Sequence, residues 1–218
     1  DTKGERGVYT FCMGPGGEVV AAASEEDTVV VNGMSHRARD GANSNAAIAV
    51  SIRTTDYEPV EGSLVLGAIA YQRRIARAAF AAGGGDYAVP VQTVGDFLSG
   101  TWGTEPTRIQ PTYGGGRVRT ADLHQVLPAF VCDTLGRGLV SFDKKLRGYA
   151  APDAVLTGVE SRTSSPVRIL RGEDGTAPAY PRLYPVGEGA GYAGGITSAG
   201  ADGVGVAQAI MGTYAALL

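Results

Sequence analysis

Glycine is concentrated near the end of this 218-residue chain, and the stretch 183–218 limits what the chain can fold into. A short apolar run at residues 183–186 is followed by a loop in which five glycines surround one carboxylate, Glu188. Glycine lets a backbone adopt positive φ and approach a ligand closely. The small residues at 196–217 predict a helix that packs tightly on a sheet. We therefore expect a strand, a glycine-rich loop and a helix.

This order of elements is typical of a loop that holds a phosphate or a cofactor. The first-turn N–H groups of the helix carry partial positive charge, which suits an anionic or electron-rich group. The residues expected to contact a cofactor are Gly187, Glu188, Gly189, Gly194, Gly195 and Ile196. The competing interpretation is a structural turn, because similar glycine-rich turns occur where nothing binds.

Residues 187–210, GEGAGYAGGITSAGADGVGVAQAI, resemble the C-terminal flavin-binding segment of two-dinucleotide-fold FAD-dependent oxidoreductases. The stretches 6–25, 29–47, 79–98 and 152–169 resemble a poorly characterised family of bacterial FAD-dependent dehydrogenases. The resemblance implies FAD as cofactor, with the carboxylate of Glu188 near its ribityl or pyrophosphate part. It also implies oxidoreductase chemistry on an unidentified small-molecule substrate, and it leaves NAD(P)H open as a second redox partner.

The glycine fingerprint that opens a FAD-binding Rossmann fold is not found in this sequence. That fingerprint follows a strand, precedes a helix, and has an acidic residue about 20 positions further on. The glycine triplets at 83–85 and 114–116 are instead followed by sequence that predicts loops and strands. The resemblance implies that the missing N-terminal dinucleotide-binding portion precedes Asp1. We therefore expect the C-terminal portion of a longer flavoprotein, inactive as an isolated fragment.

The sequence as a whole predicts an α/β fold of the α+β kind in two parts. Residues 1–180 are expected to form a substrate-covering mixed α/β domain with a flap at 99–119, and residues 181–218 the strand, loop and helix of a Rossmann-like FAD-binding domain. Strands are predicted at 7–12, 18–23, 28–32 and 46–53, the first two paired as a hairpin. We expect a helix at 67–82, a helical hairpin from Thr120 to Phe142, and two strands within 155–169.

Two polar segments supply candidate substrate-binding residues. The loop at 33–45 contains His36 and Asn45, and loops of this length are often functional, although a solvated loop is the alternative. In the segment 155–169, strand alternation places Glu160, Arg162 and Ser164 on one face. Arg162 is a candidate cation for a carboxylate, and the hydroxyl groups of Ser164 and Ser165 would orient the substrate. The alternative is a structural ion pair between Glu160 and an arginine.

No catalytic residue is fixed by the sequence, and the candidates are Arg162, Ser164 and Cys12. In the family that the chain resembles, the turn at Cys12 often reads Cys-Met-Cys-Pro-Gly-Gly, whereas here Gly14 replaces the second cysteine. A local disulfide cannot form, but one thiol near a flavin can still react.

Composition argues against several classes of partner. The net charge of -3 gives no sign of a nucleic-acid partner. No apolar run reaches the roughly 18 residues of a membrane span, and the first residues are polar, so we expect a cytoplasmic protein. Cys12, Cys132 and His124 lack metal-ligand spacing, so no metal site is expected.

Two other functions remain open at this stage. The first is a non-catalytic binding or scaffold domain that keeps a flavoprotein-like fold. The second is a hydrolase that uses Ser164, which the sequence disfavours because no histidine stands in a suggestive position.

Overall fold

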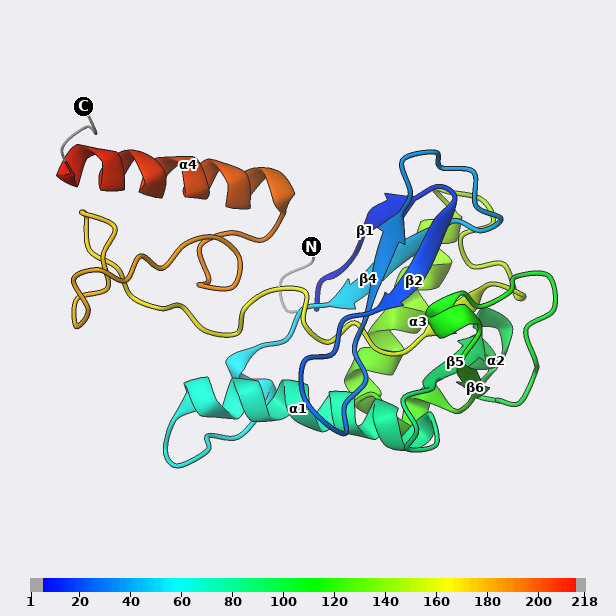
Figure 1. Ribbon diagram of the computed structural model, residues 1–218. Coiled ribbons are helices and arrows are strands. Elements are labelled where there is room, and N and C mark those ends of the chain that lie inside the picture. Colours follow the sequence, from blue (N-terminus) through cyan, green and yellow to red (C-terminus); the bar gives the residue numbers. More distant parts are fainter. Residues whose placement is uncertain (1–5, 215–218) are drawn as a thin grey trace. The chain divides into compact units, whose positions relative to one another are not determined.

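A computed structural model describes residues 6–214 of the chain (Figure 1). The predicted α+β class is confirmed, with small sheets and four α-helices within these residues. The backbone forms two compact units. The first contains the chain up to Asp56 together with Tyr71–Ser161, and the second contains Tyr57–Ala70 and the chain from Arg162 onward.

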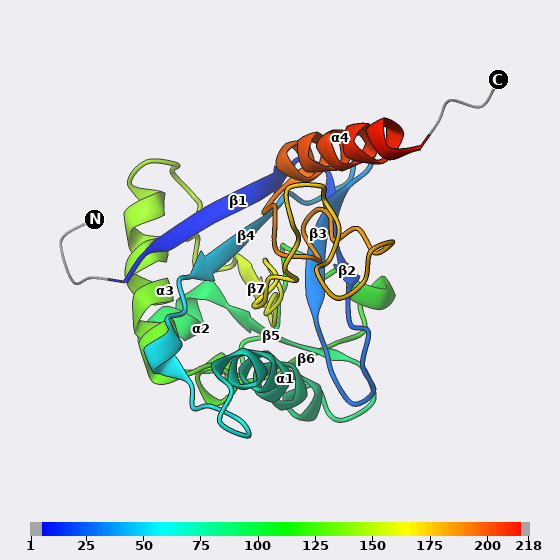
Figure 2. The ribbon, with the colours of Figure 1, turned by 90° about the vertical axis from the view of Figure 1, so that its left-hand side faces the viewer.

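Two antiparallel strand pairs lie in the first unit (Figure 2). Strand β1 (Val8–Gly14) pairs with β4 (Asn45–Val50), and β2 (Gly17–Ala21) pairs with β3 (Val31–Ser35). The sequence predicted strands in all four places. It placed β3 three residues too early, because residues 28–30 are buried without belonging to a strand.

The predicted hairpin between the first two strands is wrong, because β1 and β2 belong to different ladders. The register of β1 shifts between Phe11 and Gly14, and Cys12 within this bulge has a φ of 52°. Gly16 has a φ of 61°, and a Cβ atom there would collide with the backbone of Arg39. These left-handed residues turn the chain out of one ladder and into the next.

Asn45 joins the two ladders. Its Nδ2 atom donates to the carbonyl oxygen atoms of Glu18 at 2.7 Å and Met34 at 3.1 Å, which are register partners across β2 and β3. Three glycines leave room for its side chain, and a Cβ atom on any of them would crowd it: Gly14, Gly17 and Gly33. The glycine-rich turn is therefore explained by packing around one side-chain amide.

Replacing Asn45 with alanine should lower the free energy of unfolding by about 1–2 kcal/mol, because two hydrogen bonds that connect the ladders are lost. Urea denaturation monitored by circular dichroism measures this change. The exposed neighbour Ser44 provides the control, and Ser44→Ala should alter stability by less than about 0.5 kcal/mol. Equal stability of both variants would show that other contacts join the ladders.

A three-stranded sheet forms the centre of the first unit. Strand β5 (Val89–Thr93) is fully buried, with β6 (Val118–Thr120) parallel on one side and β7 (Val155–Thr157) antiparallel on the other. The strand continues through Pro90, which lies at its second position. Gln92 has no exposed surface and connects two loops, donating to the carbonyl of Thr101 and accepting from the N–H of Leu123.

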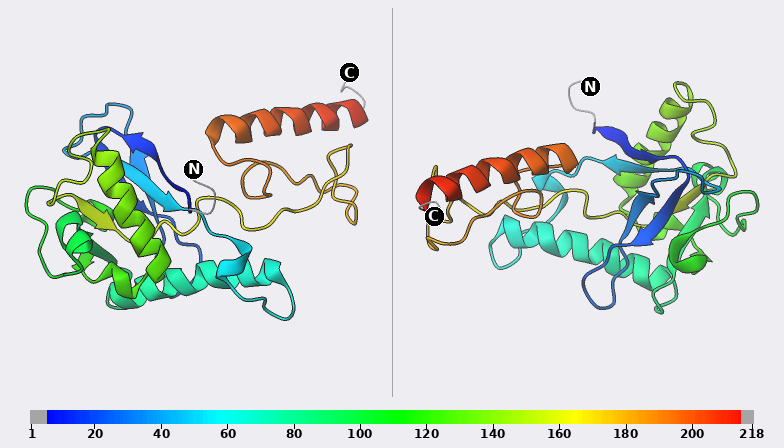
Figure 3. Two further views of the ribbon diagram at one scale, coloured as in Figure 1. Left: turned by 180° about the vertical axis from the view of Figure 1, so that it is seen from behind. Right: turned by 45° about the horizontal axis from the view of Figure 1, so that its top comes forward.

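The helix predicted at 67–82 is confirmed as α1 (Leu64–Ala82), and a short helix α2 (Val94–Ser99) follows β5. The helix α3 (Ala129–Asp143) packs across β1 and β4 (Figure 3). Gly138 permits this approach, because a Cβ atom there would lie 2.7 Å from the side chain of Val8.

The helical hairpin predicted from Thr120 to Phe142 is wrong in its first half, whereas its second half is confirmed as α3. Thr120 ends β6, and Asp122 caps only a 3-10 helix, η3 (Leu123–Gln125). The N–H of Leu123 bonds to Gln92, and the α-helix begins only after Pro128. The other 3-10 helices in the described region are η1 (Thr54–Asp56) and η2 (Tyr113–Gly115).

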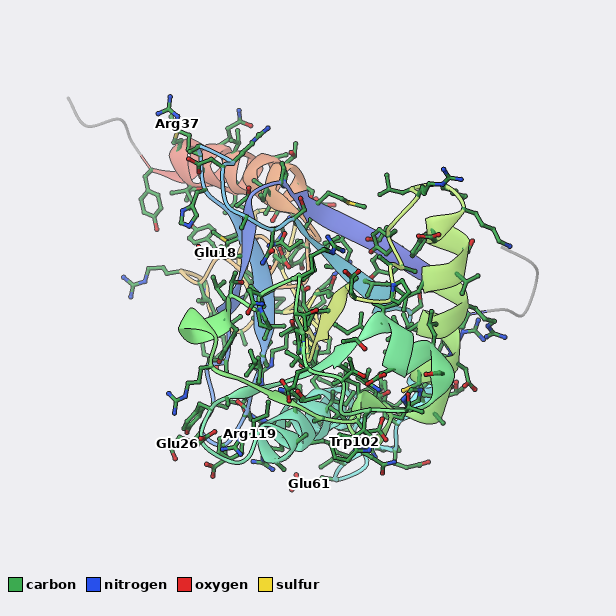
Figure 4. The ribbon with its side chains drawn as sticks, turned by 90° about the vertical axis from the view of Figure 1, so that its right-hand side faces the viewer. Glu18, Glu26, Arg37, Glu61, Trp102 and Arg119 are labelled. Atoms are coloured by element: carbon green, nitrogen blue, oxygen red, sulfur yellow. The ribbon has the colours of Figure 1, made fainter. Side chains whose placement is uncertain are left out.

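The predicted flap at 99–119 is hydrogen-bonded to the rest of the first unit. Asp96 of α2 accepts from the backbone and the hydroxyl of Thr104, and Arg108 forms an ion pair with Asp153. Further along, the Thr112 hydroxyl accepts from the N–H of Val19. Trp102, labelled in Figure 4, is exposed on this segment.

Of the two strands predicted within 155–169, the structure contains only β7. The N–H of Gly158 bonds to the carbonyl of Pro90, and beyond this point β5 offers no further strand pairing. The Ser165 hydroxyl bonds to the carbonyl of Val167, and Pro166 has no N–H, so this part of the chain forms an irregular turn.

The strand predicted at residues 183–186 is also wrong. The N–H of Leu183 bonds to the carbonyl of Tyr180 in a turn, and Pro185 has no N–H. Among the residues of the second unit that the structure describes, there is no strand with which this segment could pair. The helix predicted at 196–217 is confirmed as α4 (Ile196–Thr213), and positions 215–217 of that prediction lie outside the described residues. Among the helices of the described region, none is both long and apolar enough to cross a bilayer.

Candidate cofactor-binding site

The glycine-rich loop at 187–195 contains two tight turns. The N–H of Gly191 donates to the carbonyl of Glu188 at 2.9 Å, and that of Tyr192 donates to the carbonyl of Gly187 at 3.0 Å. Gly187 and Gly191 have φ values of 72° and 83°. A Cβ atom at Gly191 would also collide with the carbonyl oxygen of Val167. Glycine is therefore required at these two positions by the backbone itself.

An ion pair between Arg171 and Asp202 fixes the start of this loop. The guanidinium donates to both carboxylate oxygens of Asp202, at 2.5 and 3.0 Å, and to the carbonyl of Pro185 at 2.9 Å. Asp202 also accepts from the N–H of Gly187 at 2.8 Å. A residue in the second turn of α4 is thus connected directly to the backbone of the loop.

Tyr192 fixes the other side of the loop. The guanidinium carbon of Arg171 lies 3.7 Å from the centre of its ring, and its hydroxyl donates to the carbonyl of Ile169 at 3.0 Å. Arg168 donates to the carbonyl of Gly191 at 3.0 Å. The loop is therefore held to the segment 164–171 by several side chains and to α4 by one carboxylate.

Both members of this ion pair are stabilised in their charged forms. Hydrogen bonding from Arg171, followed by the N–H of Gly187, lowers the pKa of Asp202 from 3.8 to about 2. The hydrogen bond to Asp202 also raises the pKa of Arg171. The two side chains are only 19% and 16% exposed, so the pair is partly protected from solvent.

The residues predicted to contact a cofactor lie on the open side of this loop. Glu188 and Gly189 are exposed, and a Cβ atom at Gly189 would meet nothing within 4 Å. Gly195 is the N-cap of α4 and has no side chain that could cap the helix. The N–H groups in the first turn of α4 therefore have no acceptor within the helix. Ile196 is 94% exposed. The backbone here is open to a polar or anionic group, so the residues fit a flavin cofactor.

The structure brings the predicted substrate segment beside this loop. The N–H of Ile169 donates to the carbonyl of Ala190 at 3.1 Å, and a Cβ atom at Gly194 would lie 3.9 Å from Oγ of Ser164. Ser164 is exposed, whereas Ser165 is half-buried and bonded to its own turn. Arg162 is half-buried, and it is the first residue of the segment Arg162–Leu218 that belongs to the second unit.

The remaining candidates lie in the first unit. His36 lies 3.4 Å from the carboxylate of Glu18, and Asn45 bonds to the backbone of the same residue. Figure 4 shows Glu18 beside the β2–β3 ladder and Arg37 at the outer end of the following loop. Cys12 is exposed at the β1 bulge. Cys132 is buried, which raises the pKa of its thiol to about 11.

Sequence reasoning missed Arg171, Tyr192 and Asp202, the residues that shape the loop. Asp202 did carry a signal, since it is the only charged residue in positions 189–218. A carboxylate on a helix of small residues needs a cation or N–H donors. Arg171 lies just beyond the segment 155–169 that the sequence singled out, and no local pattern marks it.

A cavity of about 220 Å³ lies in the first unit under the segment 99–119 and is too small for a dinucleotide. Its lining contains none of the predicted site residues: Thr93, Thr104, Glu105, Pro106, Thr107, Pro152 and Asp153. Nowhere in residues 6–214 do three or more metal-ligating side chains come together.

Sequence comparison places most of the chain in a described family. Residues 1–163 match the family of "FAD-dependent protein, C-terminal domain-like" sequences. The chain belongs to this family. It is also 47% identical over 207 residues to a protein of Clostridium beijerinckii described as an uncharacterized protein, and the aligned part covers 95% of this chain but 38% of that relative.

The extent of these matches bears on the candidate site. The family match ends at residue 163, before the glycine-rich loop, whereas the similarity to the Clostridium protein covers nearly the whole chain and so continues past that residue. The chain spans less than two-fifths of that relative's length. Membership of the family supports the C-terminal part of an FAD-dependent protein.

The Arg171–Asp202 ion pair should make the stability of the loop depend on pH. Because the pKa of Asp202 is lowered to about 2 in the folded chain, its stabilising effect is fully present above its ordinary pKa of 3.8 and is lost as the pH falls towards 2. Asp202→Asn should therefore raise hydrogen exchange at the Gly187 amide near neutral pH, and the difference from wild type should shrink in acid.

Glu173→Gln is the control for this experiment, because Glu173 is an exposed acid of the same unit with no hydrogen bond or ion pair in the described structure. It should leave the exchange of the Gly187 amide unchanged. If Asp202→Asn exchanges like wild type at neutral pH, the ion pair does not hold the loop.

Proposed function

We propose that this chain is the C-terminal portion of an FAD-dependent oxidoreductase. In this proposal residues 1–180 cover the substrate, and residues 181–218 contribute the loop and helix that meet the flavin. The observation that carries the proposal is the glycine-rich loop, which is held rigid by Arg171 and Asp202 yet is open beside the N-terminus of α4. Family membership supports FAD as the cofactor.

The cofactor contacts follow from the open side of the loop. Glu188 would accept a hydrogen bond from a ribityl hydroxyl, and the backbone from Gly187 to Gly189 would pass close to the cofactor. Gly194, Gly195 and Ile196 would direct the first-turn N–H groups of α4 at the flavin ring. The flavin supplies the redox chemistry when bound, and the protein supplies position and electrostatics.

The substrate would lie on the side of the flavin nearest the segment 162–165. Ser164 is the best supported substrate contact, because its hydroxyl is exposed beside Gly194. Arg162 and Ser165 remain proposed partners for a carboxylate-bearing substrate. His36, Asn45 and Cys12 remain proposals for the intact protein, and the side-chain amide of Asn45 is already used to join the two ladders.

The exposed face of α4 supports a docking role within the intact protein. Val206 is its only buried residue in the described structure, while Ile196, Val204 and Met211 are exposed apolar side chains. A Cβ atom on four of its glycines would meet nothing within 4 Å: Gly200, Gly203, Gly205 and Gly212. Such a face fits close packing on the sheet of a dinucleotide-binding domain, which this proposal assigns to another part of the intact protein.

The isolated 218-residue chain should retain little FAD in equilibrium dialysis. One loop and one helix N-terminus provide only part of the contact area of a tight cofactor site, and the adenosine-binding fingerprint is not in this sequence. Retention of one FAD per chain with high affinity would contradict the idea that this chain is part of a larger FAD site.

In the full-length protein, Glu188→Leu should weaken FAD binding by about one to two orders of magnitude. This is the loss expected for one charge-assisted hydrogen bond of roughly 1.5–3 kcal/mol. Gly195→Val should also lower flavin content. Because Gly195 has an extended φ of -174° and open surroundings, valine fits the backbone and tests only the approach of the ligand.

Flavin content and thermal unfolding should be measured together for both variants, with Glu173→Leu as an exposed control that leaves both unchanged. Loss of flavin from a folded apo-protein supports the proposal. Full FAD occupancy with a lower melting temperature would identify the loop as a structural turn. A protein that binds FAD tightly but shows no flavin reduction with any donor would instead favour a non-catalytic binding domain.

A further inference from the structure

The cavity of about 220 Å³ in the first unit has one wall, residues 104–107, that is fixed at both of its ends. At one end, the N–H and the hydroxyl group of Thr104 donate to the carboxylate of Asp96, each at 2.9 Å. Just past the other end, the guanidinium of Arg108 donates to both carboxylate oxygens of Asp153. The wall is therefore held in place by side chains of its own unit.

The rest of the lining is fixed as well. Thr93 is the N-cap of α2, and the N–H of Gly95 in the same helix donates to the carbonyl of Pro152 at 2.9 Å. The lining surface is mainly apolar, and it includes the two proline residues Pro106 and Pro152. A cavity of fixed shape with an apolar surface can hold the hydrocarbon part of a small molecule without having to reorganise.

Two polar groups of the lining have unused hydrogen-bonding capacity in the described structure. The carboxylate of Glu105 is exposed and forms no hydrogen bond or ion pair among residues 6–214. Thr93 is only 4% exposed, and its hydroxyl oxygen accepts from the N–H of Asp96 at 3.2 Å, yet within the same residues its O–H has no acceptor. A mainly apolar cavity with a few available polar groups is the usual form of a small-molecule site.

The charges of the lining favour a cation over an anion. Its residues include two carboxylates, those of Glu105 and Asp153, and no cationic side chain. The neighbouring Arg108 is held by both oxygens of Asp153, so its guanidinium is already used and is not available to an anion. The hydrogen bond from Arg108 also lowers the pKa of Asp153. Glu105 is left as a carboxylate without a counter-ion.

We propose that this cavity binds a small organic cation, in which a primary ammonium group is attached to a short apolar chain. An ammonium group has three N–H donors, and the lining offers acceptors in the carboxylate of Glu105 and the hydroxyl oxygens of Thr104 and Thr107. The apolar chain would lie against Pro106 and Pro152. An apolar cavity of about 150 Å³ can hold benzene, so a chain of a few carbon atoms fits here. This inference is independent of the proposed flavin function.

The first measurement is an NMR titration of the 218-residue chain with n-butylammonium chloride, using sodium chloride at equal concentration as the blank. We expect the backbone amide resonances of Thr104, Glu105 and Thr107 to shift saturably. Sodium butyrate, which carries the opposite charge, should cause no saturable shift, and the uncharged 1-butanol should bind more weakly. No saturable response to n-butylammonium, or an equal response to 1-butanol, would overturn the inference.

Glu105→Gln tests the carboxylate with little change in shape. It should weaken n-butylammonium binding by about fivefold, the upper range for an exposed ion pair, whereas Glu105→Asp keeps the charge and should weaken it less. Because Glu105 has no partner in the described residues, the melting temperature should stay unchanged. Glu26→Gln is the matched control, since Glu26 is an exposed acid of the same unit, equally without a partner in residues 6–214. Equal affinity of Glu105→Gln and wild type would contradict the proposal.

Arg108→Gln separates the shape of the cavity from its charge. This variant loses the ion pair that fixes one end of the wall, while both carboxylates of the lining remain. We expect n-butylammonium to bind more weakly than to wild type, although the net charge of the protein has become more negative. Tighter binding would show that charge alone attracts the cation to this surface, and it would refute a shaped site.

Discussion

The ion pair between Arg171 and Asp202 is the interaction on which the candidate site depends. A loop with five glycines in nine residues loses much conformational entropy when it becomes ordered, and glycine side chains provide no contacts that could compensate. Arg171 bonds to Asp202 and to the carbonyl of Pro185, and it stacks on Tyr192, while Asp202 accepts from Gly187. The loop can remain open to a ligand because these side chains hold it from outside the open face.

The first unit uses side-chain amides in a comparable way. Its strands are short, and Asn45 and Gln92 supply hydrogen bonds where the ladders stop. The glycines at 14, 17 and 33 are explained by the space that Asn45 needs, and those at 187 and 191 by positive φ. By contrast, Gly189, Gly194 and Gly195 have open surroundings, which is what close approach of a cofactor would require.

Local patterns in the sequence predicted helices at 67–82 and 196–217, which the structure has at 64–82 and 196–213, and they predicted the positions of the first four strands. Periodicity and small-residue composition act over a few turns and so can be recognised locally. Strand pairing was not predictable, since Cys12 and Gly16 redirect the chain between ladders and only the distant partners β3 and β4 decide the outcome. The strand predicted at 183–186 failed because the second unit, as far as residue 214, offers it no partner strand.

The candidate site was predictable as a set of glycines around Glu188 but not as a structure. Its supporting residue Arg171 lies about 20 positions before the loop residue Tyr192 that it contacts, and Tyr192 itself stands within a run of small residues. Neither residue forms a local sequence motif. The ion pair between Glu160 and an arginine, which the sequence offered as an alternative, is not observed among the described residues, where burial raises the pKa of the Glu160 carboxyl.

The central claim is that this chain forms part of a flavin site that is complete only in the intact protein. The most direct test is the visible absorbance spectrum of the full-length protein after purification, recorded before and after anaerobic reduction with dithionite. The account predicts a yellow protein whose flavin absorbance is bleached by reduction and returns in air. A colourless full-length protein that takes up no FAD when the cofactor is added would contradict it.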